Sequence, residues 1–302
     1  MLSFFTRRVG FIFLVVLLIA YFAFIGMSMM PNSERAVPNF NLLDHGEVAW
    51  ERTQVFLSSI FQDRLGVTAG PVSLPVRDVV RAAYVNSMGL LLVALVLSTV
   101  MGVYVGTLAA LARSRRWVVH LLTMTILGVS TPSFVAALFL QQAELRFYQT
   151  FGRRLVSMGG FGWDYKHMLL PVLVLMARPL AYLTRTTFIN LRRILDENYI
   201  RTAHAKGLPR RSILQVHAFR NLAVPTLTAV GVSLRFSLSS LPVVEFFFGW
   251  PGLGYQLVQA IDARDQTLTV ALAVSMGVTF LLFNLLLDVV YRVVDPRLRE
   301  AR

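Results

Sequence analysis

The sequence predicts an all-α membrane protein with six transmembrane helices, because its composition and its charge pattern differ from those of water-soluble domains. Hydrophobic residues make up 56% of the 302 residues and charged residues only 15%, against roughly 45–50% and about 25% in soluble domains. The net charge is +13, and most of the basic residues stand in short clusters between long apolar runs. A nucleic-acid-binding protein would carry such a charge on a polar domain, so the pattern indicates a membrane protein instead.

Six apolar runs are long enough to cross a bilayer, which takes about 20 helical residues. The predicted spans are 9–30, 88–111, 117–140, 169–185, 223–248 and 268–294. The first run is longer than the apolar core of a secretory signal, about 7–15 residues, and no convincing cleavage site follows it. We therefore expect the first run to be a retained anchor.

Basic residues orient the helices, because they resist translocation across the membrane. Arg7 and Arg8 precede the first span, and basic residues are dense in the segment 186–222 and after the last span. Both termini are therefore predicted to be cytoplasmic. The predicted organisation is a cytoplasmic tip and first helix (1–30), an exterior segment expected to fold as a small cap (31–87), a transmembrane core (88–294) with an inner loop (186–222), and a cytoplasmic tail (295–302).

The inner loop predicts a helix, a turn and a second helix. An amphipathic stretch continues through Ala205, Gly207-Leu208 can form a turn, and Pro209 can open the next helix because its missing N–H has no partner at that position. The small side chains of Ala203 and Ala205 would let another protein approach the backbone, and the flanking basic residues offer charged contacts. The alternative is an amphipathic helix that binds anionic lipid.

Catalytic and metal-binding motifs are missing from the sequence. A phosphate-binding loop needs Gly-Lys followed by Ser or Thr, but the two lysines, Lys166 and Lys206, are followed by His167 and Gly207. There is no cysteine, no histidine pair at helical spacing and no pair of membrane carboxylates on one helical face. The chain is therefore predicted to be no enzyme and to hold no metal or cofactor, and any ATP chemistry would need another polypeptide.

The inner loop closely resembles the cytoplasmic coupling loop of ABC importer permeases, in the form carried by the "B"-type permeases for dipeptides, oligopeptides and nickel. Its pattern continues through Ile213, His217-Ala218, Arg220-Asn221 and Pro225, and His204 replaces a usual basic residue. The resemblance assigns the ATPase-coupling role to Tyr199, Arg201, Thr202, Ala203, Ala205, Lys206, Gly207 and Leu208.

Other elements resemble this family in the same order along the chain. They are Asp63-Arg64-Leu65-Gly66-Val67-Thr68, Gly102 with Gly106, Thr131-Pro132-Ser133-Phe134, a segment from Glu245 through an exterior turn at Trp250, Pro251, Gly252 and Gly254, and Asn284 with Asp288, Tyr291 and Asp295-Pro296-Arg297. Each element is weak alone, but their order is specific. The resemblance implies the type I ABC importer permease fold, preceded by one extra N-terminal helix.

The resemblance also implies partners, location and function. The partners would be a paralogous permease forming a heterodimer, two cytoplasmic ATPase subunits that bind ATP and Mg, and an exterior substrate-binding protein. The location would be the plasma (inner) membrane of a bacterium or archaeon. The predicted function is ATP-driven import of peptides or a similar small solute. Relatives with this loop also carry nickel complexes, glutathione, opines or sugar oligomers. An ion-coupled secondary transporter is a remote alternative, because inverted repeats and mid-membrane acids are missing.

Two arginines depart from the family pattern. Arg178 and Arg235 fall near the middle of predicted spans, where each charge costs about 2.5–3.5 kcal/mol to insert on translocon scales. We expect each to face a polar translocation path, or else to pair with Glu245 or with a carboxylate of the partner permease. Arg178, Arg235 and Glu245 are therefore the candidate pathway residues.

Overall fold

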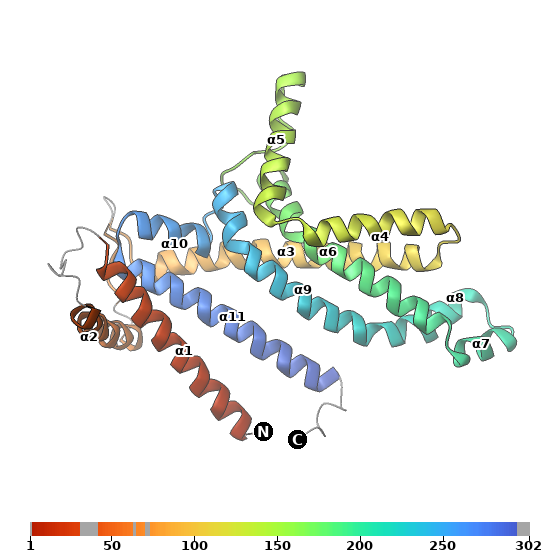
Figure 1. Cartoon of the computed structure of the whole chain (residues 1–302), viewed down its shortest axis with the longest axis horizontal. Coiled ribbons are helices and arrows are strands. Elements are labelled where there is room, and N and C mark those ends of the chain that lie inside the picture. The colour runs from red at the N-terminus through yellow and green to blue at the C-terminus, as the bar shows by residue number, and fades with distance from the viewer. Residues whose placement is uncertain (1, 31–41, 63–64, 70–72, 295–302) are drawn as a thin grey trace. The chain divides into compact units, whose positions relative to one another are not determined.

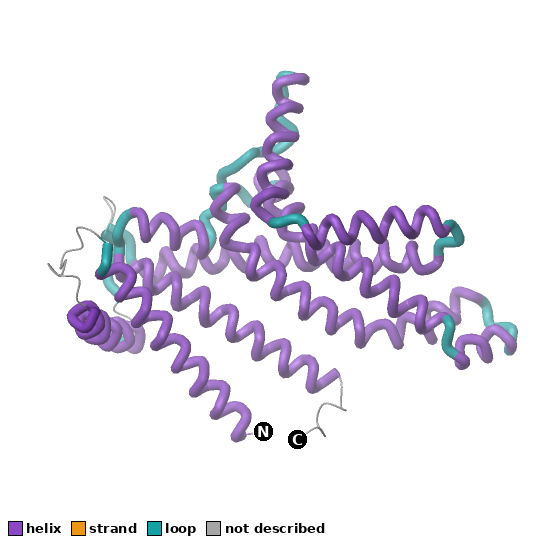
Figure 2. Tube along the Cα trace, in the orientation of Figure 1, coloured by secondary structure: helices purple, strands orange, loops and turns teal. Residues whose placement is uncertain are grey.

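The computed structural model describes residues 2–30, 42–62, 65–69 and 73–294, and these residues are predominantly helical (Figure 1; Figure 2). One isolated β-bridge pairs Val67 with Pro75. The helices are α1 (Leu2–Ser28), α2 (Leu42–Phe61), α3 (Val76–Leu111), α4 (Arg115–Ser130), α5 (Ser133–Phe151), α6 (Tyr165–Leu195), α7 (Asn198–Ala205), α8 (Arg210–Ser212), the π-helix η1 (Ile213–Ala218), α9 (Phe219–Phe248), α10 (Leu253–Asp262) and α11 (Gln266–Val294).

Five continuous helical segments of the described chain are long and apolar enough to cross a membrane. They are Arg8–Ser28, Val76–Leu111, Tyr165–Leu195, Arg210–Phe248 and Gln266–Val290. The helices expected at 9–30, 88–111, 169–185, 223–248 and 268–294 are confirmed. Several extend further than predicted: α3 begins at Val76, inside the segment expected to be exterior, and α6 continues to Leu195.

The span predicted at 117–140 is not one continuous helix. Helix α4 ends at Ser130, α5 begins at Ser133, and the two axes differ by 108°. Pro132 has no backbone N–H and disfavours a helical conformation at the residue before it, and Thr131 accordingly has an extended backbone with ψ 122°. The pair α4–α5 is therefore a sixth, broken span or a re-entrant segment.

The chain divides into two compact units, of which the first comprises Met1–Met88 and Gly249–Asp288. Its core joins α1, α2, α10 and α11, with fully buried side chains such as Ala20, Ala49 and Leu272. The Arg8 guanidinium forms a salt bridge with Asp288, so a charge of the first span meets a charge of the last. Such pairing is typical of ionisable groups in spanning helices.

The second unit comprises Gly89–Phe248 and Val289–Arg302, with α6 packed against α4 and α9. Helix α3 approaches α6 at two glycines. A Cβ at Gly102 would lie 2.7 Å from the Leu183 Cβ, and a Cβ at Gly106 would lie 2.6 Å from the Thr184 carbonyl oxygen. Small residues at this spacing allow the backbones of spanning helices to pack closely.

Some predicted features lie outside the described residues. These are residues 31–41 of the exterior segment, Asp63 and Arg64, the tail 295–302 and its Asp295-Pro296-Arg297 motif.

Candidate functional site

The inner loop folds as helix, turn and helix, as the sequence predicts. Helix α7 ends at Ala205, Gly207 has a φ of +74°, and α8 begins at Arg210. Pro209 has an extended backbone and is the cap of α8 rather than its first residue. Because L-residues with a side chain rarely adopt this φ, the turn depends on glycine.

Two backbone hydrogen bonds close the end of α7. Gly207 N–H donates to the His204 carbonyl at 2.9 Å, and Leu208 N–H donates to the Ala203 carbonyl at 3.2 Å. This pairing is a Schellman motif, which satisfies carbonyls left without partners at a helix end. The turn therefore has one defined geometry.

The inward face of α7 is apolar and packs on η1. Ile200 and Ile213 are each 1% exposed, and Ala203 is buried in the same cluster. The Ala203 side chain is therefore covered by this chain itself, and its small size lets α7 lie close to η1. That a partner approaches the backbone at Ala203 stays a prediction.

The outward side of α7 and its turn carries most of the other residues that the sequence predicts to contact an ATPase. We name the exposed residues Arg201, Thr202, Ala205, Lys206, Gly207 and Leu208 the coupling surface. Its charged members, Arg201 and Lys206, are both basic. Such a surface can contact an acidic groove on another protein.

The coupling surface is joined to a spanning helix in two ways. Tyr199, also exposed, accepts a hydrogen bond at 2.9 Å from the Asn221 amide of α9. In addition, α8, η1 and α9 form one continuous segment, Arg210–Phe248. The packing of Ile213, which places α7 on η1, was missed from the sequence because it pairs residues on opposite sides of the turn.

A second hydrophobic cluster holds this end of the spanning helices together. It buries Ala110 of α3, Leu191 of α6, Ala218 of η1 and Leu222 of α9. Helix α7 packs against η1, and η1 is therefore its connection to this packed group of helix ends. The π-turn at η1 is a feature often found at functional positions.

The three candidate pathway residues lie in different surroundings. Arg178 on α6 is half-buried, Arg235 on α9 is exposed, and Glu245 near the end of α9 is fully buried. The salt bridges of the described residues include none at Arg178 or Arg235. That these arginines face a polar path, or pair with Glu245 or a carboxylate of a partner permease, stays a prediction.

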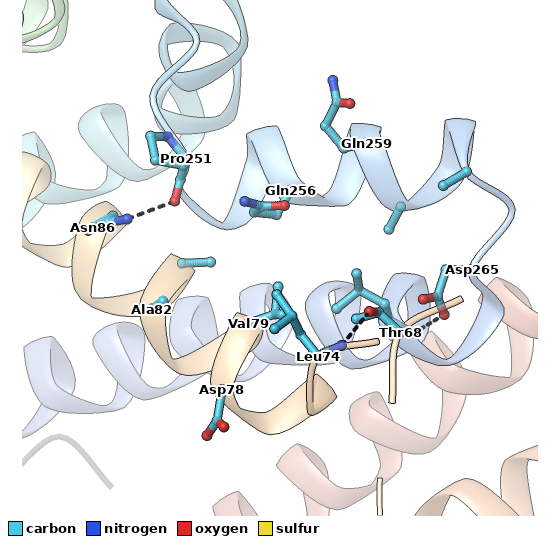
Figure 3. Close-up of a pocket in the computed structure, with 14 residues that line it drawn as sticks. Thr68, Leu74, Asp78, Val79, Ala82, Asn86, Pro251, Gln256, Gln259 and Asp265 are labelled. Atoms are coloured by element: carbon cyan, nitrogen blue, oxygen red, sulfur yellow. Dashed lines mark hydrogen bonds between the residues drawn. The ribbon is translucent and has the colours of Figure 1, made fainter. Parts of the chain in front are cut away.

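The exterior turn packs on the first part of α3 within the first unit. Trp250 is fully buried and its indole Nε1–H donates to the Asn86 carbonyl at 3.1 Å. The Asn86 amide donates to the Pro251 carbonyl at 3.0 Å, a bond drawn in Figure 3. The turn then leads through Gly252 and Leu253-Gly254 into α10, where Leu253 N–H donates to the Ser87 hydroxyl at 2.7 Å.

A pocket of about 530 Å³ lies beside this turn, between α3 and α10 (Figure 3). Its polar lining includes Asn86, Gln256 and Asp265. The Asp265 carboxylate accepts backbone N–H bonds from Leu268 at 2.9 Å and from Ala69 at 2.8 Å. Asp265 thereby caps the start of α11 and fixes the segment before α3, a role that the sequence analysis missed.

Two polar side chains of α5 hold the loop that follows it. Glu144 is 5% exposed and accepts a 2.8 Å hydrogen bond from the Leu155 N–H. Gln141 donates to the carbonyls of Met158 and Phe247, both at 3.0 Å. At the end of this loop a hydrogen bond from His167 lowers the pKa of Asp164.

Within the described residues, no three His, Asp or Glu side chains gather as metal ligands would.

Comparison with known families gives the class of this protein. Residues 102–300 match the family described as the inner membrane component of binding-protein-dependent transport systems. The chain belongs to this family and is a permease subunit of an ABC importer, a multi-pass protein of the bacterial inner membrane. A permease subunit is a transport component rather than a catalytic enzyme.

Three individual relatives show which kinds of permease this chain is similar to. The chain is 30% identical to the oligopeptide transport system permease protein OppB of Haemophilus influenzae, over 99% of this chain and all of that protein. It is 27% identical to the dipeptide permease protein DppB of Lactococcus lactis, over 99% of this chain and all of that protein. It is 32% identical to the glutathione permease protein GsiC of Escherichia coli, over 81% of this chain and 78% of that protein.

Proposed function

We propose that this permease subunit imports peptides and is driven through its coupling surface by a cytoplasmic ATPase. The observation that carries the proposal is the exposed, basic turn after α7, which leads directly into the continuous helical segment Arg210–Phe248. Peptide import is supported by similarity over nearly the whole chain to permeases named for oligopeptides and dipeptides.

The proposed topology places α7 in the cytoplasm with both termini. Its support is the concentration of exposed arginines around the inner loop, at Arg192, Arg193, Arg201, Arg210, Arg211 and Arg220. The exterior turn, α2 and α10 would then lie on the opposite side of the membrane. We assign to that side the contact with the substrate-binding protein.

The proposed mechanism is alternating access. A loaded binding protein docks outside, ATP closes two ATPase subunits inside, and the coupling surface transmits this closure to α9. We assign the exposed side of α9 to the partner permease or the translocation path, because it carries Thr228, Arg235 and Ser239. Lipid would not solvate such a face, whereas a second, paralogous permease or an aqueous path would.

Cross-linking tests the coupling proposal directly, because the natural chain contains no cysteine. In the complete complex, Ala205→Cys on the coupling surface is expected to cross-link to the ATPase subunit. The short reagent carries a maleimide, which reacts with the cysteine, and a succinimidyl ester, which reacts with a lysine of the ATPase. The matched control is Ser114→Cys, which is exposed between α3 and α4 on the same proposed side. Denaturing gel electrophoresis of both variants measures the adduct. Equal cross-linking of the two cysteines, or none at residue 205, contradicts the proposal.

ATP turnover is expected only from the assembled complex. The isolated chain lacks a phosphate-binding loop, so purified alone it should hydrolyse no ATP, and the complex should hydrolyse ATP faster when the binding protein is loaded with peptide. The rate of phosphate release measures ATP hydrolysis by the isolated chain and by the complex. A complex whose ATPase subunits carry an inactivating substitution of their nucleotide-binding lysine controls for contaminants, and turnover by the isolated chain above that background refutes the assignment.

Glutathione is a second candidate substrate, because one of the relatives is a glutathione permease. Glutathione is itself a small peptide-like solute with free carboxylates. Loading the binding protein with glutathione in the same ATPase measurement separates the two substrates: stimulation by glutathione but by no other peptide favours this candidate.

A further inference from the structure

The second unit contains a cavity of about 170 Å³ beside the break between α4 and α5. Its polar lining comes from three places in the chain: Thr131 and Ser133 at the break, Arg178 on α6 and Ser240 on α9. The volume is several times the roughly 30 Å³ that one water molecule takes up in the liquid. The cavity can therefore admit a small polar group of a ligand.

The cavity holds a cation whose charge no carboxylate of the described chain balances. The Arg178 guanidinium lies 6.0 Å from the centroid of the Phe236 ring, and its charge forms no salt bridge with the described residues. The ring can attract and orient the guanidinium but cannot neutralise it. Arg178 also lies near the middle of its spanning helix, Tyr165–Leu195, where an unbalanced charge is costly.

Hydroxyl groups complete the lining. The described structure gives the side chains of Ser133 and Ser240 no hydrogen-bond partner, and both line the cavity. Helix α5 begins at Ser133, and its described backbone bonds start with Ala136 N–H to the Pro132 carbonyl. The earlier N–H groups of this turn add partial positive charge to the same end of the cavity.

We propose that this cavity binds a carboxylate of the transported solute. Arg178 would supply two parallel N–H donors, which match the geometry of a carboxylate, and the hydroxyls of Ser133 and Ser240 would donate to its remaining lone pairs. The inference rests on the proposed function in peptide import. It specifies peptides with a free carboxylate, at the C-terminus or on an acidic side chain, as the preferred substrates.

The structure separates Arg178 from Arg235, which are alike in the sequence. Arg235 is exposed and does not line this cavity. The inference therefore assigns carboxylate binding to Arg178 and its two serine neighbours alone.

Transport by the reconstituted complex tests the inference. The complete complex in liposomes is supplied with binding protein loaded with trialanine, with trialanine amide, or with an amidated tripeptide that has a central glutamate. Calorimetry first verifies that each peptide loads the binding protein, and rates are compared at saturating loaded protein. The wild-type complex is expected to transport both carboxylate-bearing peptides about tenfold faster than trialanine amide, a ratio that corresponds to about 1.4 kcal/mol.

Variants identify the residue responsible. Arg178→Gln is expected to slow the carboxylate-bearing peptides about tenfold and to leave trialanine amide within about twofold. Arg178→Lys should retain part of the preference, because lysine keeps the charge but lacks the planar fork. Ser133→Ala should weaken the preference for carboxylate-bearing peptides severalfold while leaving the charge of Arg178 in place. The control is Arg185→Gln, two turns further along α6, exposed and outside the cavity.

The possible outcomes test carboxylate binding in the cavity separately from the proposed function in peptide import. A preference for only one of the two carboxylate-bearing peptides identifies which carboxylate is bound and supports the site. Equal slowing of acid and amide by Arg178→Gln, or unchanged rates in both Arg178→Gln and Ser133→Ala, overturns the inference and leaves peptide import intact. Failure of the wild-type complex to transport any of the three peptides contradicts peptide import itself.

Discussion

Replacing Gly207 with valine is expected to abolish transport while leaving the subunit inserted and assembled. Gly207 has a φ of +74°, and a β-branched residue in this region carries strain of about 1–3 kcal/mol. A Cβ at this position would meet no atom of this chain within 4 Å. Any loss beyond the backbone strain therefore reports a partner that approaches the turn. Uptake relative to the amount of assembled complex is the measurement.

Two variants separate strain from contact. Gly152 also has a positive φ, +67°, with no atom within 4 Å of an added Cβ, but it ends α5 outside the coupling loop. Gly152→Val should therefore keep most of the transport activity. Gly207→Asn tolerates the left-handed backbone, so transport should fall less than in Gly207→Val if strain contributes. Normal uptake by Gly207→Val would show that the turn is not part of a tight interface.

Replacing Gly106 with leucine is expected to prevent accumulation of the folded subunit. The first atom of the new side chain would lie 2.6 Å from the Thr184 carbonyl oxygen and 2.7 Å from the Thr187 Cβ. Helices α3 and α6 would have to separate, and overpacking of this kind costs typically 1–3 kcal/mol, occasionally more. Size-exclusion chromatography of the detergent-extracted subunit, with its melting temperature, measures the loss.

The matched control is Gly26→Leu on α1. Gly26 also belongs to a spanning helix, but an added Cβ there meets no atom within 4 Å. Its melting temperature should stay close to that of the natural chain. Gly106→Ala, which adds only the crowded Cβ, should give an intermediate loss. Equal stability of Gly106→Leu and Gly26→Leu would show that α3 and α6 do not pack closely at Gly106.

The spans and the coupling turn could be predicted from the sequence because their causes are local. A run of about 20 apolar residues commits a segment to the bilayer whatever its neighbours are. Gly207 and Pro209 likewise interrupt a helix through their own backbone restrictions. Pro132 carries the same kind of local signal for the break between α4 and α5, and the prediction of a span at 117–140 did not use it.

Only the tertiary structure decided which side chains pack together and which line a cavity. Ala203 was expected to face a partner, and it is buried because Ile213, beyond the turn, packs over it. Arg178 and Arg235 have the same chemistry and similar depth in the sequence pattern, yet Arg178 alone lines the cavity. The rotation of each helix about its axis is set by packing against other helices, such as α6 against α4 and α9, and hydrophobicity along one segment does not encode that rotation when most of its residues are apolar.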